Sequence, residues 1–110
     1  MTDELYTVRI WISSDWARYV SERIWHESQH IQKQFDGAIE ITFRVAGLEE
    51  IKQWVLSLGP EARVLEPPEL IYEMADSLAR TKRYYEGVDI KQPAAAESME
   101  IYRERNLFHV

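Results

Sequence analysis

Apolar residues occupy every second position in two segments of the chain, and this alternation predicts two half-buried β-strands. The positions are Tyr6, Val8, Ile10 and Ile12 in the first segment, and Ile39, Ile41, Phe43 and Val45 in the second. β-branched residues suit a pleated strand that packs one face on a core. Asp36-Gly37 precedes the second segment, and an Asp-Gly pair is typical of a hairpin turn. We therefore predict that another strand precedes this turn.

Residues 26–35, which lead into the turn, fit either a strand or the continuation of a helix that starts earlier in the chain. Ser13-Ser14-Asp15 offers an N-cap and a first-turn acid for that helix. The apolar positions of that helix are Trp16, Val20 and Ile24. Ile31 and Phe35 fit the same helical stripe, which would make one long helix. Because a hairpin requires a strand on both sides of its turn, we predict a strand over residues 26–35, with Ile31 and Phe35 facing the core.

Two further helices, a short strand and a tail complete the pattern. Gly47 opens a helix that Gly59-Pro60 ends, and Ala62–Glu66 is a short strand. Pro67-Pro68-Glu69 starts a third helix, which ends near Gly87. The predicted buried face of the second helix is Leu48, Ile51, Val55 and Leu58, and the apolar stripe of the third is Leu70, Ile71, Met74, Ala75, Leu78 and Tyr85. Residues 88–110 form a tail with a short helix over residues 94–105.

The order strand, helix, strand, strand, helix, strand favours an α+β fold: a ferredoxin-like βαββαβ sandwich with a C-terminal helical extension. We predict one domain over residues 1–87 and a tail over residues 88–110. Two helices should cover one face of an antiparallel sheet whose first and third strands are central. The other face of the sheet stays open unless something covers it.

Composition narrows the functional class. The formal charge of −6 argues against a domain whose main work is binding a phosphate backbone. The chain has no cysteine, which is compatible with a reducing cytoplasm, and its first residues show no signal peptide. No apolar run approaches the ~18 residues of a membrane span. We expect a cytoplasmic protein that does not enter a membrane.

The segment His26-Glu27-Ser28-Gln29-His30 matches the zinc-protease pattern H-E-x-x-H. That pattern needs both histidines one turn apart on a helix, so that both imidazoles reach one metal ion. On a strand the two histidines would lie roughly 13 Å apart, at about 3.3 Å per residue. A zinc hydrolase, with Glu49 or Glu50 as third ligand, therefore requires a helix here. We predict a strand, and hence no metal site. We also expect no cofactor and no catalytic residue.

The same region resembles the WCX domain, the C-terminal extension of WYL-domain transcriptional regulators. The motifs that carry the resemblance are A-R-Y-V-S-E-R at residues 17–23, W-H-x-S-Q at residues 25–29, D-G at residues 36–37 and V-L-x-P-x-x-L at residues 64–70. The family typically has proline after the histidine. This chain has Glu27 there, which creates the zinc-protease spelling. The resemblance implies a ferredoxin-like fold and a bacterial regulator that contacts DNA through domains absent from this chain.

The open sheet face is where we expect a ligand or a second subunit. Its predicted residues are Arg9, Trp11, Arg44, Arg63, His26 and His30, with Ser28, Gln32 and Thr42 beside them. Guanidinium groups pair with phosphate and a tryptophan stacks on a base, which suits a nucleotide or single-stranded nucleic-acid effector. Glu40 shares the face and can pair with an arginine.

Three functions follow from these patterns. The preferred one is a non-catalytic regulatory module that senses an effector, self-associates, or both. Self-association is included because the resemblance implies a homodimer. The others are a small zinc hydrolase and a free-standing ligand-binding domain. Trp11 suits an interface anchor. Trp16, Trp25 and Trp54 are expected to be structural. The tail residues Leu107, Phe108 and Val110 either reach a partner or end as a linker.

Overall fold

The computed structural model describes residues 4–88. The short helix predicted over residues 94–105 and the apolar tail residues lie outside this range. The chain divides into two compact units, Met1–Arg80 and Thr81–Val110. The first unit holds the four-stranded sheet. The domain boundary predicted at residue 87 stays a prediction.

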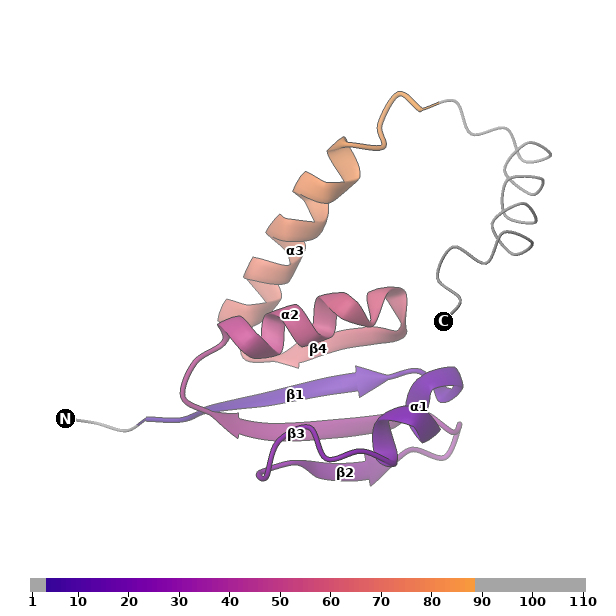
Figure 1. Cartoon of the computed structure of the whole chain (residues 1–110), viewed down its shortest axis with the longest axis vertical. Coiled ribbons are helices and arrows are strands. Elements are labelled where there is room, and N and C mark those ends of the chain that lie inside the picture. The colour runs from indigo at the N-terminus through magenta and orange to yellow at the C-terminus, as the bar shows by residue number, and fades with distance from the viewer. Residues whose placement is uncertain (1–3, 89–110) are drawn as a thin grey trace. The chain divides into compact units, whose positions relative to one another are not determined.

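Four strands form one antiparallel sheet in the first unit (Figure 1). They are β1 Tyr6–Ile12, β2 His30–Lys33, β3 Ile39–Val45 and β4 Ala62–Glu66. The order in the sheet is β2-β3-β1-β4, so the first and third strands are central, as predicted. β1 pairs with β3 over its full length and with β4 on its other side, where the register shifts between Arg9 and Ile10.

Three α-helices and one short 3₁₀ helix complete the part of the chain that is described. They are α1 Ser14–Ser21, α2 Glu49–Ser57, η1 Gly59–Glu61 and α3 Pro68–Arg83. The described residues therefore have the predicted α+β composition, with a four-stranded antiparallel sheet. None of these helices combines the length and the apolar content needed to cross a bilayer.

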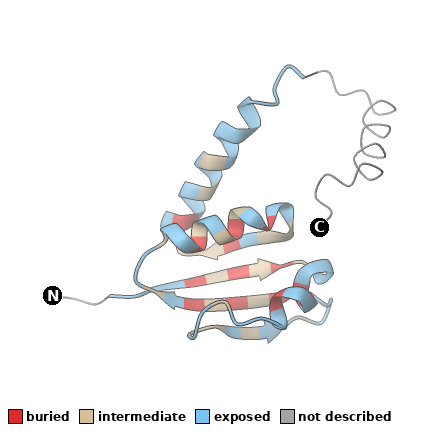
Figure 2. Ribbon diagram, in the orientation of Figure 1, coloured by how far each residue is buried: buried red, intermediate tan, exposed pale blue. Residues whose placement is uncertain are grey.

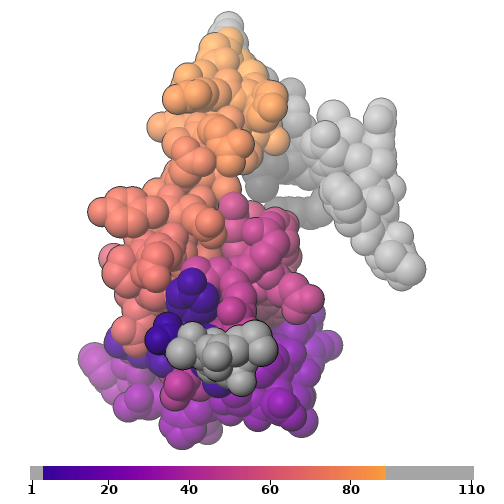
Figure 3. All heavy atoms as spheres, turned by 90° about the vertical axis from the view of Figure 1, so that its left-hand side faces the viewer, coloured from indigo at the N-terminus to yellow at the C-terminus, as the bar shows by residue number. Residues whose placement is uncertain are grey.

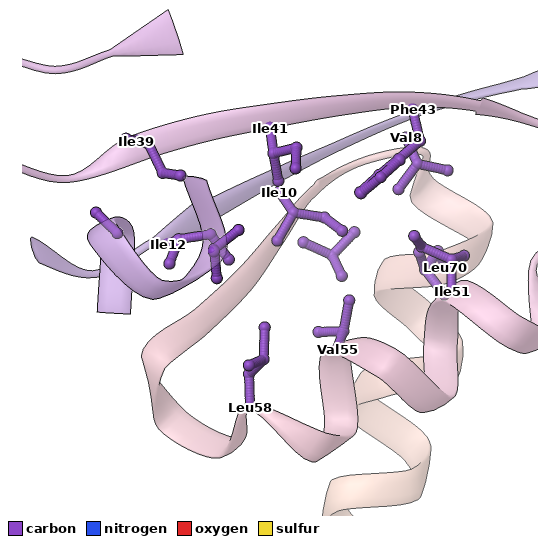
Figure 4. Packing of buried hydrophobic residues seen from close by; sticks show 13 residues of the cluster. Val8, Ile10, Ile12, Ile39, Ile41, Phe43, Ile51, Val55, Leu58 and Leu70 are labelled. Carbon is purple, nitrogen blue, oxygen red and sulfur yellow. The ribbon is translucent and has the colours of Figure 1, made fainter. Parts of the chain in front are cut away.

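The hydrophobic core lies between one face of the sheet and the helices α1 and α2 (Figure 4). Buried residues alternate along the central strands, as Figure 2 shows. The buried core residues are Val8, Ile10 and Ile12 from β1, Ile39, Ile41 and Phe43 from β3, Ala17 and Val20 from α1, Ile51 and Val55 from α2, and Leu58, Val64 and Leu70. The alternation in the sequence therefore fixes which sheet face the helices cover.

The start of α1 is held by the hairpin turn and by η1. The hydroxyl of Ser13 donates a 2.6 Å hydrogen bond to Glu61 Oε1, and Ser13 N–H donates to the Glu61 carbonyl. Ser13 occupies the predicted N-cap position, but its hydroxyl does not bond to the helix. Gly37 has φ +93°, and a Cβ there would lie 3.2 Å from Cβ of Ser14. Glycine is thus required at this turn for both conformation and space.

The strand predicted over residues 26–35 is wrong in both of its ends. β2 covers only His30–Lys33, and the chain turns at Glu27 and Ser28 before it. Phe35, which was expected in the core, is fully exposed because it lies in the hairpin turn, beyond the last pair of β2 with β3. Ile31 is half-buried against the core, as predicted. Ile24, predicted on the first helical stripe, lies outside α1 and is 86% exposed.

The apolar stripe predicted on the third helix is buried only at its beginning. Leu70 in the first turn of α3 is fully buried, and Met74 packs against the core at its side. Ile71 and Leu78 are 40% and 52% exposed. α3 follows the edge strand β4, and only its first two turns reach the core. Tyr85, predicted on the stripe, lies beyond the end of the helix and is exposed.

Phe43 and Phe35 offer a matched test of the hairpin. Phe43→Ala should lower the free energy of unfolding by about 3–5 kcal/mol, because it leaves a cavity in the core. Phe35→Ala should change it by less than about 0.5 kcal/mol, since the ring contacts mainly water. Urea denaturation followed by circular dichroism measures both. Similar losses for the two substitutions would contradict the placement of β2 and its turn.

Candidate functional site

The loop between α1 and β2 is built by the W-H-x-S-Q residues, and the side chain of Gln29 is its centre. Gln29 Oε1 accepts hydrogen bonds from the backbone N–H groups of Trp25, at 2.7 Å, and His26, at 3.3 Å. Gln29 Nε2 donates to the carbonyl of Arg23 at 2.9 Å. One amide therefore satisfies three backbone groups that neither helix nor strand supplies with partners.

Ser28 ties this loop to the sheet. Arg44 N–H donates a 2.9 Å hydrogen bond to Ser28 Oγ. In the register of β2 with β3, where His30 stands opposite Thr42, residue 28 would stand opposite residue 44. Ser28 thus reaches its ladder position with its hydroxyl instead of its backbone. A side-chain hydrogen bond here takes the place of a backbone hydrogen bond of the ladder. For this reason β2 begins at His30 and the predicted longer strand does not form.

The His26 ring is oriented by the same loop. Ser28 N–H donates to His26 Nδ1 at 3.1 Å. Ser28 Oγ lies 2.7 Å from the same nitrogen, which allows its hydroxyl to donate there while accepting from Arg44. The imidazole packs edge-on against Phe43, with 6.3 Å between ring centres.

A cavity of about 460 Å³ opens between this loop, the end of β3 and the start of α2. Its wall is a chain of ring contacts: Trp25 to Trp54 at 5.2 Å, Trp54 to Phe43 at 5.5 Å, and Phe43 to His26. Trp25 is held from behind, because its indole N–H donates to the Val20 carbonyl at 2.9 Å. Trp25 and Trp54 pack against the core as the sequence predicts. Trp16 differs, since it is 38% exposed and meets Tyr19 edge-on.

The rim of the cavity is acidic. Glu49 and Glu50, in the first turn of α2, line it together with the segment Val45 to Gly47 and Ile51. The sequence placed these two acids in the first turn of the helix and offered them as zinc ligands, but their place beside Trp54, one turn further along α2, was missed. The signal was present as an i, i+4 spacing between Glu50 and Trp54. The sequence did not predict the turn at residues 27 and 28, which brings Trp25 and His26 to the cavity beside Trp54.

The second candidate surface is the open sheet face. The register places Arg9, Trp11, Arg44, Arg63 and His30 on this face, away from the core positions. His26 and Ser28 are not on it, because the chain turns before β2 begins. The grouping of the three arginines and the tryptophan was thus predicted correctly, and the inclusion of His26 and Ser28 was wrong.

The three arginines form a diagonal, and the middle one is already paired. Arg9 Nε donates to Glu40 Oε1 at 3.1 Å, and one of its terminal nitrogens lies 3.6 Å from Glu66 Oε1. Arg44 stands opposite Thr7 and Arg63 opposite Trp11, so they are about 13 Å apart along the strand and two strands apart across it. Neither Arg44 nor Arg63 pairs with a carboxylate within residues 4–88.

The geometry required of H-E-x-x-H is not met. His26 lies in a turn and contacts Phe43, whose side chain is on the core face. His30 begins β2 opposite Thr42, on the other face of the sheet. Within the described residues, no group of three or more His, Asp or Glu side chains is arranged to hold a metal ion. The two histidines therefore point to different sides and not to one site.

Glu27 gives a test of the loop. Gln29 N–H donates to the His26 carbonyl at 3.1 Å, which makes Glu27 the second residue of a β-turn. Proline is favoured there, and within residues 4–88 the Glu27 N–H has no hydrogen-bond partner to lose. Glu27→Pro should therefore raise the free energy of unfolding by about 0.4–1 kcal/mol through the unfolded state.

The control is Gln29→Leu, which removes three hydrogen bonds to backbone groups and should lower the free energy of unfolding by about 1–3 kcal/mol. Urea denaturation measures both variants. A Glu27→Pro protein less stable than the unaltered chain would show that the loop does not have this turn.

Comparison with known protein families matches residues 4–81 to the WCX domain. No curated protein matches the chain. The matched range includes the sheet, α1, α2, most of α3 and the whole Trp25–Gln29 loop, and it covers more than two thirds of the 110 residues. The chain therefore belongs to the WCX domain family.

Proposed function

We propose that this WCX domain is a non-catalytic regulatory module of a WYL-type bacterial transcriptional regulator, and that its main task there is self-association. WCX domains are associated with WYL regulators, which act on transcription and work in the cytoplasm where the chromosome lies. The strand order β2-β3-β1-β4, with α1 and α2 on one face, supports a ferredoxin-like sandwich. DNA would be contacted by other domains of such a regulator.

The apolar side of α3 is the observation that carries this proposal. Ile71 and Leu78 are 40% and 52% exposed, although they continue the stripe that begins at the buried Leu70. The space-filling view shows the α3 side chains, salmon to orange, on the molecular surface (Figure 3). Contiguous apolar side chains left in water on a stable helix are a frequent mark of a protein interface.

A second copy of the chain fits this stripe. Ile71 and Leu78 lie at its two ends, with the small Ala75 near its middle. A two-fold axis beside Ala75 would set Ile71 of each copy against Leu78 of the other, in an antiparallel pair.

The test is sedimentation velocity of the full chain over a wide concentration range. We expect a dimer, and Leu78→Glu should leave only monomer, because it places a charge where Leu78 of one copy meets Ile71 of the other. Arg80→Gln is the control. It changes the net charge by the same amount on the opposite side of α3 and should keep the dimer. A monomeric unaltered chain, or a Leu78→Glu dimer as stable as the unaltered one, would overturn the proposal.

The open sheet face supports a second, narrower proposal: binding of an extended anion. Arg44 and Arg63 are exposed and far apart, and Trp11 stands directly opposite Arg63. A single strand of nucleic acid is long enough to meet both guanidinium groups and to stack one base on Trp11. Arg9, the arginine between them, is already paired with Glu40 and Glu66 and is therefore less available to a ligand.

Titration with a fluorescently labelled oligothymidine, followed by anisotropy, tests this face. Arg44→Ala combined with Arg63→Ala should weaken binding about tenfold or more, since two phosphate contacts are lost. Arg9→Ala alone should have little effect. Binding that is unchanged in the double variant would remove this face as an anion site.

A further inference from the structure

The cavity beside the Trp25–Gln29 loop has the size and construction of a small-molecule site. Its volume of about 460 Å³ falls within the range of ligand pockets, about 300–1,000 Å³. Its walls are held in place by contacts within the protein. Trp25 is hydrogen-bonded to the Val20 carbonyl, His26 is hydrogen-bonded to Ser28, and Trp54 packs between Trp25 and Phe43. The ring-lined wall therefore exists before a ligand arrives, which keeps the cost of ordering low.

The charge of the lining selects the class of ligand. Two of the lining residues, Glu49 and Glu50, are acidic, and none is lysine or arginine. The start of α2 contributes only about half a positive charge, which two carboxylates outweigh. An anion is thus disfavoured here, in contrast to the open sheet face.

The two carboxylates are available to a ligand. Glu49 Oε1 accepts one long hydrogen bond, 3.4 Å from Gln53 Nε2. Within residues 4–88 the side chain of Glu50 has no partner. The aromatic wall adds a second attraction for positive charge, because the faces of tryptophan and phenylalanine rings are electronegative.

We propose that this cavity binds a small organic cation with an apolar body, such as a quaternary ammonium compound. The ammonium group would lie over the faces of Trp54 and Trp25, with Glu49 and Glu50 facing it from α2. That such a cation acts as the regulator's effector rests on the proposed function. The binding itself does not.

The experiment is titration of the full chain with choline, followed by isothermal calorimetry and tryptophan fluorescence. The matched neutral compound is 3,3-dimethylbutan-1-ol, which replaces the ammonium nitrogen of choline by carbon. We expect saturable binding of choline and binding of the neutral compound that is weaker by about tenfold or more. Equal binding of the two compounds, or no saturable binding of choline in the millimolar range, would overturn the proposal.

Variants locate the site. Glu49→Gln combined with Glu50→Gln should weaken choline binding about tenfold, and it alters only exposed side chains, so the fold should persist. Asp15→Asn combined with Glu73→Gln is the control, since it removes the same charge at exposed positions outside the cavity lining. Choline binding that is unchanged in the first variant contradicts the cavity as its site.

The Leu78→Glu protein separates the two proposals. It should bind choline as the unaltered chain does, because Leu78 does not line the cavity. Loss of dimer with choline binding retained supports both proposals. A dimer that forms normally in a chain without choline binding leaves self-association standing and ends the cation site.

Discussion

The hydrogen bond from Arg44 N–H to Ser28 Oγ is the constraint on which the candidate site depends. A backbone partner at this position would have continued β2 along β3 and produced a longer, regular edge strand. The hydroxyl ends the ladder at His30 instead, and the chain before it closes into the loop centred on Gln29. The final residues of β3 are therefore flanked by Trp25 and His26. The cavity exists because a loop with large rings lies where a strand would otherwise lie.

The W-H-x-S-Q residues accordingly act as one unit. Trp25 is placed by its indole hydrogen bond to α1, Ser28 by its bond to β3, and Gln29 by three bonds within the loop. The resemblance to zinc proteases came from Glu27, the position in this segment whose side chain the loop does not use. A surface position in a turn accepts many residues, so a spelling that looks catalytic arose where the fold imposes little constraint.

The cavity and α3 meet the same packed core. Ile51 lines the cavity and belongs to the group of buried side chains that also includes Leu70, the residue that anchors α3 (Figure 4). Tightly packed cores transmit small displacements because they have little free volume. A ligand in the cavity would therefore contact the group of residues that holds the proposed assembly helix. The open sheet face lies on the opposite side of the sheet from this core.

The sequence by itself determined the elements whose patterns are local. The alternation in β1 and β3, the Asp36-Gly37 turn, and the strand Ala62–Glu66 were all predicted and are all present, because hydrophobic period and turn chemistry act over a few residues. The central positions of β1 and β3 followed from the order of the elements, and the set of arginines on the open face followed from the alternation along the strands.

Only the tertiary structure decided three features: where β2 begins, whether the α3 stripe is buried, and which residues surround the cavity. Each depends on contacts between segments distant in sequence. Ser28 meets Arg44 across the sheet, α3 follows an edge strand and leaves most of its apolar side uncovered, and Trp25 meets Trp54 on another element. Local periodicity shows that a helix has an apolar side, but the surface that covers this side is set by the arrangement of the whole chain.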